Sequence, residues 1–229
     1  MIGIIGAMDI EVEKLISVMS NRKTAVISGI VFHAGQIENT DCVVAKCGVG
    51  KVSAAVCAQT MILQYATNAL INVGVAGGIG KNIHIGDIVV SSGLVQHDID
   101  TTSIGDQKGL ISGLNLVTIP ATKRLTELVA VTANSIYGEG VHTGIIATGD
   151  QFIGDGEKLK KIAEEFGASA CEMEGASIAQ VCYMNQIEFV VIRAISDNAN
   201  EAAEVDFATF ALMSAHKTAS LIQRVLPRM

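Results

Sequence analysis

Residues Phe189 to Asp197 read FVVIRAISD, and this stretch decides the fold class. Its apolar, often β-branched side chains, without Pro or Gly, are typical of a strand buried on both faces of a largely parallel sheet. Arg193 interrupts the run, and because an unpaired buried cation is costly, we expect a carboxylate or a polar cavity to face it. Asp197 lies where the strand ends, at the edge where open α/β sheets bind ligands. The two residues are a candidate site, although they could equally serve only to tie loops together.

The rest of the chain alternates apolar runs with helical patterns. This alternation predicts a single α/β domain over residues 1–229, with a central, mostly parallel or mixed twisted sheet flanked by helices. A helix that follows the first strand places Glu11 in its first turn. The buried strand Ala69–Val75 runs into Ala76 and Gly77, where small or missing side chains let a ligand approach the backbone.

Other segments carry weaker signals. Pro120 is expected in the first turn of a helix that continues to Asn134, because Pro is favoured at that position. Residues 97–115 are polar and show no clear period, and a loop of this length in a small domain is usually functional or packed against a partner.

Composition excludes several classes of protein. The net charge of −7 and the 4% aromatic content argue against a nucleic-acid partner, which requires clustered cations or stacking platforms. Mean hydropathy is high at +0.43, yet no apolar run approaches the roughly 18 residues of a membrane span. The chain opens directly on a strand without a signal-peptide pattern, and its cysteines form no CxxC pair, so we expect a cytoplasmic protein.

Glycine and histidine motifs give no cofactor or metal site. Gly48, Gly50 and Lys51 lack the further Gly and the Ser or Thr of a phosphate loop, and the first strand lacks a dinucleotide fingerprint. His97 and the aspartates that follow it have no second set of ligands at metal spacing, so a loop turn is the expected role. We therefore expect no cofactor and no metal.

Two carboxylates, Glu172 and Glu174, end the strand that begins at Ala168. Side chains two positions apart on a strand point to the same side, and holding both acids there requires a cationic or hydroxyl-rich partner. The vicinal hydroxyls of a ribose are such a partner. The alternative is that Glu174 only caps the helix that starts at Gly175.

Taken together, these motifs resemble the bacterial 5′-methylthioadenosine/S-adenosylhomocysteine nucleosidases. The resemblance spans nearly the whole chain and rests on segments in the family's order and approximate spacing. They are Gly6-Ala7-Met8 with Glu11, Gly48-Val49-Gly50-Lys51-Val52, Gly74 through Gly78, Thr148-Gly149-Asp150 with Phe152-Ile153, Glu172-Met173-Glu174 and Arg193 through Asp197.

The resemblance implies a nucleoside phosphorylase fold and a homodimer that releases adenine from 5′-thio-substituted nucleosides with water and no cofactor. It makes Asp197 the general acid toward adenine N7 and Glu11 the base that activates water, with Arg193 helping to hold that water. Such a pair suits a bond that breaks through an oxocarbenium-like state. The substrate contacts that it implies on the base, ribose and 5′-group are Met8, Val49, Ala76, Gly77, Phe152, Ile153, Glu172, Met173, Glu174, Ser196, Phe207 and Ile104.

Two departures from the family pattern bear on the substrate. Val75 stands where family members usually carry a Ser that helps to position the water. Residues 101–108 are polar where the family has an aromatic-rich segment that each subunit contributes to its neighbour's 5′-thio pocket. S-adenosylhomocysteine, 5′-deoxyadenosine and other 5′-substituted adenosines therefore remain open as substrates beside methylthioadenosine.

Two other functions compete with hydrolysis. A purine nucleoside phosphorylase needs a cationic pocket for phosphate, whereas here Glu11 would face that position with only Arg193 against it. A nucleoside-binding protein without turnover would keep Phe152 and Glu174 but would not need both Asp197 and Glu11. The presence of both acids favours an enzyme.

Overall fold

Strand β10 (Glu188–Asp197) lies inside the sheet, as the run FVVIRAISD predicts. It pairs in parallel with β5 (Ala69–Gly78) on one side and antiparallel with β6 (Ile88–Gln96) on the other. Every residue of β10 after Glu188 is buried. A strand of β-branched and apolar residues is stable here because both of its faces are covered and both of its edges are paired.

The computed structural model describes residues 1–197 and 203–229, and residues 203–208 by their backbone alone. The other strands are β1 (Ile2–Gly6), β2 (Ser20–Ile27), β3 (Ile30–Ile37), β4 (Thr40–Lys46), β7 (Thr118–Pro120), β8 (Val141–Thr148) and β9 (Ala168–Glu172). The helices are α1 (Asp9–Ser17), α2 (Lys51–Tyr65), α3 (Lys123–Tyr137), α4 (Gly156–Phe166), α5 (Gly175–Asn185) and α6 (Ala203–Val225), with short 3₁₀ turns η1 (Thr102–Ile104) and η2 (Leu226–Arg228).

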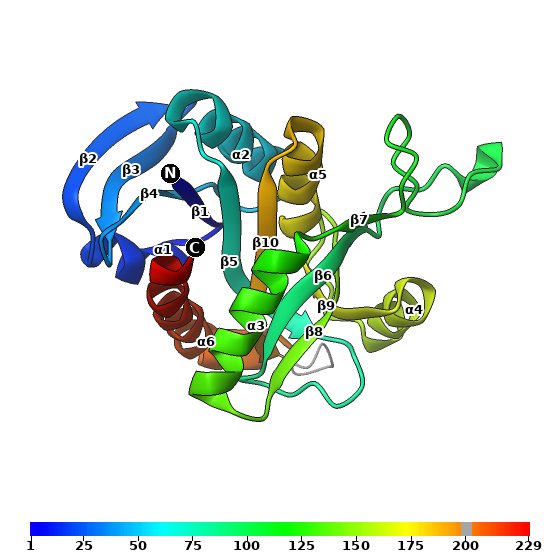
Figure 1. The fold of residues 1–229 in the computed structure, drawn as a ribbon. Coiled ribbons are helices and arrows are strands. Elements are labelled where there is room, and N and C mark those ends of the chain that lie inside the picture. The colour runs from blue at the N-terminus through cyan, green and yellow to red at the C-terminus, as the bar shows by residue number, and fades with distance from the viewer. Residues whose placement is uncertain (198–202) are drawn as a thin grey trace.

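The sheet is mixed, and part of it closes on itself. Its strand order is β10-β6-β8-β9-β5-β1-β4-β3-β2, and β10 also pairs with β5. The strands β5, β10, β6, β8 and β9 therefore form a ring, from which β1, β4, β3 and β2 extend (Figure 1). Strands β5 and β9 meet near the carboxyl end of each, where Gly77 pairs with Cys171. The closure brings chain segments from several strand ends to one place.

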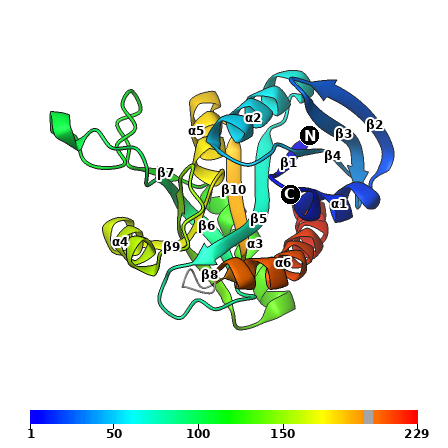
Figure 2. The same cartoon turned by 180° about the vertical axis from the view of Figure 1, so that it is seen from behind.

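Helices cover both faces of the sheet, as the mixed α/β prediction requires. Helices α2 and α5 pack side by side, and their buried residues share one apolar cluster with Ile5, Leu70 and Val191 of the sheet. Helices α1, α3 and α6 pack on a second cluster, whose members from the sheet include Ile4 and Ile192. Successive residues of β1 and β10 thus enter opposite cores, because side chains alternate across a strand. Figure 2 shows the same two layers from behind.

One local prediction is wrong and one strand went without a prediction, and both concern edges of the sheet. Pro120 is the last residue of β7, which pairs with β6, and the helix begins later, at Lys123. Residues Ser20–Ile27 form the edge strand β2. Nearly all of this strand is exposed, so its sequence does not alternate between apolar and polar residues. Edge strands tolerate Pro and polar residues, so neither segment carries a clear strand signal.

The segment between β6 and β7 extends away from the body of the protein (Figure 1). Apart from η1 and a single bridge between Ile111 and Leu116, residues 97–117 form no regular structure. This agrees with the lack of a period in the sequence. Over the described residues, no helix combines the length and apolar character that crossing a membrane would need.

Candidate active site

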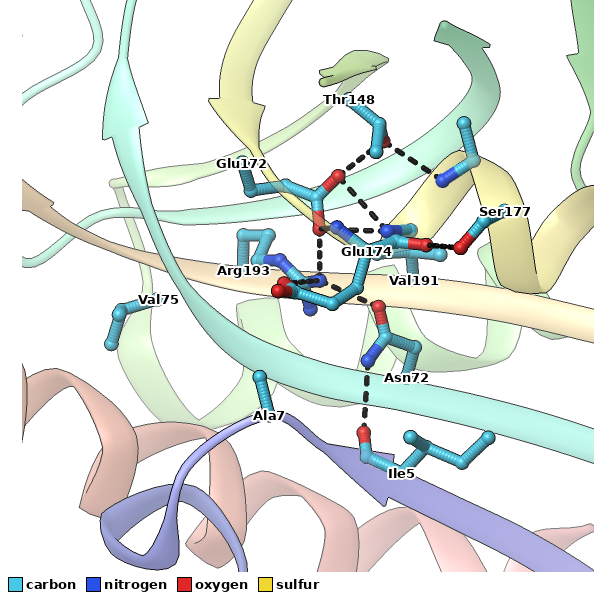
Figure 3. A network of polar contacts seen from close by, with 12 residues as sticks. Ile5, Ala7, Asn72, Val75, Thr148, Glu172, Glu174, Ser177, Val191 and Arg193 are labelled. Atoms are coloured by element: carbon cyan, nitrogen blue, oxygen red, sulfur yellow. Dashed lines mark hydrogen bonds and ion pairs between the residues drawn. The ribbon is translucent and has the colours of Figure 1, made fainter. Parts of the chain in front are cut away.

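Arg193 is the centre of a buried polar network (Figure 3). The residue is 1% exposed, and its Nη2 donates hydrogen bonds to Glu172 Oε2 and to Asn72 Oδ1, the latter at 2.5 Å. Glu174 Oε2 lies 3.9 Å from the same nitrogen. The expected carboxylate partner of the buried guanidinium is thus present, and two glutamates share it. Burial disfavours a lone charge, so each of these ionised groups depends on the others.

Glu172 is held entirely by protein groups. Its carboxylate accepts hydrogen bonds from the Thr148 hydroxyl and from the backbone amides of Glu174 and Gly175, at 3.1 Å and 2.8 Å to Oε2. Thr148 Oγ1 in turn accepts from the amide of Ala176 at 2.8 Å. These are the first amides of α5, which have no partner within the helix. Glu172 therefore caps α5 and orients Arg193, and the alternative in which the Glu174 side chain caps the helix is wrong.

Glu174 has fewer hydrogen-bond partners than Glu172, and its pKa is raised. Its Oε1 accepts a hydrogen bond from the Gly50 amide at 2.9 Å, and the side chain is buried. Burial, followed by the nearby negative charge of Glu172, raises the pKa of Glu174 to about 7. Glu174 is therefore the acid of this pair that retains hydrogen-bonding capacity for a ligand with hydroxyl groups.

Glu11 approaches the network from the opposite side of β5. Its Oε2 accepts from the amides of Ala7 at 2.6 Å and Met8 at 2.9 Å, and its Oε1 accepts from the Val75 amide at 3.1 Å. Burial raises the pKa of Glu11, and the positive charge of Arg193 and these three amides offset part of that rise. A carboxyl group with a raised pKa and fixed geometry is suited to accept a proton.

Gly74 is required for Glu11 and Arg193 to meet. A Cβ atom at this position would lie 2.6 Å from Glu11 Oε1 and 3.2 Å from Arg193 Nη1. Both distances are shorter than a comfortable contact, so any side chain at residue 74 would push the carboxylate or the guanidinium away. The glycine therefore allows a carboxylate from α1 to reach a guanidinium from β10 across β5.

Asp197 lines a small cavity next to this network. The cavity, whose volume is ≈ 40 Å³, is also lined by Gly77, Gln151, Phe152, Ile153, Leu159, Cys171, Glu172 and Met173. Asp197 is buried, and the Ser196 hydroxyl donates to its Oδ2 at 3.0 Å. Glu172 belongs to both the cavity wall and the Arg193 network, so the two form one continuous site.

Strand β5 sets the separation of the two candidate catalytic acids. Glu11 binds the amide of Val75, and Asp197 pairs with Gly77 in the sheet register. Two residues along a strand correspond to roughly 7 Å. The anchoring points of the two acids are thus far enough apart, at the carboxyl ends of β5 and β10, for a sugar to lie between the acids.

The structure gathers most of the substrate contacts expected from the sequence, but not all of them. Ala76 is buried in the core, where its carbonyl oxygen lies 3.5 Å from Ser196 Oγ. Val49 is largely exposed ahead of α2, and Ile104 is 79% exposed on the segment between β6 and β7. Met8 contributes its amide to Glu11, and the side chain of Phe207 lies outside the described residues.

Three participants in the network had no role in the sequence analysis. Asn72 binds Arg193, Thr148 binds Glu172, and Gly74 makes room for Glu11. Asn72 had a signal that could have found it, since a polar residue interrupts the buried run ALINVGV just as Arg193 interrupts its own strand. The role of Thr148 depends on a contact between separate strands, which the sequence does not display.

Asp98 fixes loops at the rim of the site. Its carboxylate accepts from Lys51 Nζ at 2.7 Å and from the Asp150 amide at 2.9 Å, and Asp150 accepts from the Lys51 amide at 2.8 Å. The interaction with Lys51 and that with the Asp150 amide hold the pKa of Asp98 below its usual value despite partial burial. Among the described residues, no group of three or more His, Cys, Asp or Glu side chains is arranged to hold a metal ion.

Comparisons with known proteins show the family to which this chain belongs. A model of the Phosphorylase superfamily matches residues 1–227. A 5′-methylthioadenosine/S-adenosylhomocysteine nucleosidase from Shewanella sediminis is 41% identical over 229 residues, covering 100% of this chain and 99% of the relative. The nucleosidase of the same name from Neisseria meningitidis was solved with methylthio-immucillin-A and superposes with a TM-score of 0.96. It is 33% identical in sequence, and the match covers 100% of this chain and 99% of the Neisseria chain. A futalosine hydrolase mutant of Helicobacter pylori gives a TM-score of 0.95 at 34% identity, with 100% and 99% covered. The chain therefore belongs to the 5′-methylthioadenosine/S-adenosylhomocysteine nucleosidase family of the phosphorylase superfamily.

Proposed function

We propose that this protein hydrolyses the N-glycosidic bond of 5′-substituted adenosines, with methylthioadenosine and S-adenosylhomocysteine as the main substrates, and releases adenine. The observation that carries the proposal is that two buried acids, Glu11 and Asp197, have their partners on β5, Val75 and Gly77, only two residues apart. The Shewanella sediminis relative and the Neisseria enzyme bear this activity in their names, and the Neisseria enzyme was solved with methylthio-immucillin-A.

In the proposed reaction, Asp197 donates a proton to adenine N7 as the glycosidic bond breaks. Phe152 and Ile153, which share the cavity wall with Asp197, contact the base by stacking and through the backbone. Protonation removes the negative charge that would otherwise develop on the departing base. A positive charge develops on the sugar in the transition state. The carboxylates around Arg193, which outnumber its single guanidinium, stabilise that charge.

Glu11 activates the attacking water on the other side of the sugar, and Glu174 binds the ribose hydroxyls. The three amides that hold the Glu11 carboxylate fix its direction, so a water beside it can be aimed as well as deprotonated. Val75 offers only its backbone amide to this arrangement, so Glu11 and Arg193 supply the groups that position the water. Residues 1–229 act as one catalytic domain in this proposal.

The charge balance of the site favours water over phosphate as the nucleophile. Glu172 and Glu174 lie within salt-bridge distance of Arg193, and Glu11 converges on the same guanidinium. A phosphate dianion would have to enter a cluster in which one cation already faces three carboxylates. Phosphorolysis would require unneutralised cations at this position.

A phosphate-free assay tests this function. Purified protein should release adenine from methylthioadenosine and S-adenosylhomocysteine in a buffer without phosphate, and added phosphate should leave the initial rate unchanged. Adenosine should be the poorest member of a panel that also contains 5′-deoxyadenosine, since it alone carries a polar 5′-hydroxyl where the others have a thio-substituted or apolar 5′-group. A rate that requires phosphate would make the protein a phosphorylase, and a strong preference for adenosine would contradict the proposed pocket.

We further propose a homodimer in which residues 97–115 of each subunit complete the neighbour's pocket. Apolar side chains are exposed along the paired helices α2 and α5: Val52, Val56, Leu63, Tyr183 and Met184. Contiguous apolar patches of this kind mark interaction surfaces. The segment that carries Ile104 extends from the body (Figure 1) and can reach a second subunit.

Charge placed on this helix pair should dissociate the dimer. Leu63→Glu, at a position 69% exposed, should convert a species of about twice 23.9 kDa into a monomer in sedimentation velocity, and adenine release should fall with it. Burying a carboxylate in an apolar interface is strongly unfavourable. Val131→Glu is the matched control, because Val131 is 65% exposed but lies on α3, on the other side of the sheet. A wild-type protein that sediments as a monomer at micromolar concentration, or equal effects of both variants, would rule out this interface.

A further inference from the structure

Arg193 is surrounded by acids, and its orientation matters to all of them. Glu172 from β9 and Glu174 from the start of α5 face its Nη2, and Glu11 from α1 converges with its Nη1 above Gly74. Among the described residues, Cys47, just after β4, is a further titratable group near this cluster, and burial raises the pKa of its thiol. A small rotation of the guanidinium would therefore change the balance of charge at every acid of the site.

Asn72 is a neutral group with two fixed hydrogen bonds in this cluster. Its Oδ1 accepts from Arg193 Nη2 at 2.5 Å, and its Nδ2 donates to the carbonyl oxygen of Ile5 on β1 at 2.9 Å. The side chain is buried, and its backbone pairs with both neighbouring strands, opposite Ile5 and Val191. Both ends of the amide are thus occupied, which fixes its oxygen toward the guanidinium.

We propose that Asn72 is a positioning residue for the reaction, which anchors Arg193 to strand β1 and thereby keeps the guanidinium aimed at Glu11 and Glu174. This inference rests on the proposed function. An amide accepts from the guanidinium through its oxygen and donates to a backbone carbonyl through its NH₂ group, so that one side chain links the two. Without Asn72, the guanidinium would keep its contacts with Glu172 and, from Nη1 at 3.2 Å, with the carbonyl oxygen of Ile192, but none with β1.

The variant Asn72→Asp changes the charge without changing the shape. An aspartate would still accept from Arg193, but it would present an oxygen to the Ile5 carbonyl and add a fourth carboxylate to the cluster. Extra negative charge raises the pKa of nearby carboxyls, and Glu11 must be ionised to accept a proton. The acidic limb of the kcat/KM profile should therefore move to higher pH in Asn72→Asp. Its kcat/KM at neutral pH should fall by about 10- to 100-fold, mostly through kcat.

Asn72→Leu and Ser91→Ala separate positioning from stability. Asn72→Leu keeps the branching at Cγ but removes both hydrogen bonds, so kcat should fall without a shift of the limb toward higher pH. Ser91 is fully buried and binds the Val191 amide on β10 at 2.9 Å, yet no hydrogen bond joins it to Arg193. Ser91→Ala should thus lower the melting temperature while leaving the pH profile in place. If Asn72→Asp keeps the wild-type profile and kcat, or if Ser91→Ala shifts the profile equally, the inference is overturned.

A readout without substrate distinguishes this inference from the proposed function. Carboxyl ¹³C shifts of glutamate-labelled protein report the titration of the buried acids directly. In Asn72→Asp, the titration of the buried glutamates should move to higher pH than in the wild type, whether or not adenine is released. A wild-type protein without adenine release would refute the proposed function, whereas unchanged glutamate titration in Asn72→Asp would refute the role of Asn72 alone.

Discussion

Asp197→Asn should lower the rate of adenine release by about 10²- to 10⁴-fold, the range that a general acid supplies. The amide has the same size and can still accept the hydrogen bond from Ser196, so the local structure should persist. It cannot deliver an acidic proton to adenine N7, so the base must leave as a poorer leaving group. Single-turnover release of adenine from methylthioadenosine, followed by chromatography, measures the effect. Nucleoside binding, measured by calorimetry, should change only a few-fold.

Asp150→Asn serves as the control in the present protein, because Asp150 caps the start of α2 at the rim of the site and its amide form can still accept from Lys51. Equal turnover in wild type and Asp197→Asn would refute the assignment of the acid.

Glu11→Gln is expected to have an effect of similar size, about 10²- to 10⁴-fold on kcat, for a different reason. The wild-type carboxylate accepts from three backbone amides, at Ala7, Met8 and Val75. A glutamine has only one accepting oxygen, so its NH₂ group would face at least one of these donors, and it cannot take a proton from water. Both the positioning and the activation of the nucleophile are lost.

The pH dependence gives this prediction a direction. Burial raises the pKa of Glu11, so the wild-type rate should fall as the pH decreases through that raised value and the carboxylate becomes protonated. The residual activity of Glu11→Gln should lack this acidic limb. Glu13→Gln, an exposed change on the same helix, is the control and should leave rate and profile unaltered. A Glu11→Gln enzyme within two-fold of the wild-type kcat would eliminate Glu11 as the base.

Glu172 and Glu174 illustrate how far residue type leads without contacts. Their spacing predicts two acids on one side of a strand end, and both do approach Arg193. One of the two makes its hydrogen bonds within the protein and the other remains available to a ligand. The Thr148 hydroxyl and the first amides of α5 decide which, because they bind Glu172. Those partners are supplied by β8 and by the helix turn, and their positions follow from packing.

The sequence by itself determined the features that have a strong periodicity or composition. These are the buried strand β10, the position of Glu11 just after β1, and the small residues at the end of β5. It failed at the sheet edges, β2 and Pro120, because solvent-exposed pairing leaves no apolar pattern. Only the tertiary structure decided that Glu11 reaches Arg193 over Gly74 and that Asn72 ties the guanidinium to β1. The reason is physical: side-chain periodicity records which face of an element is buried, whereas a site is made by hydrogen bonds between elements that the closed sheet brings together.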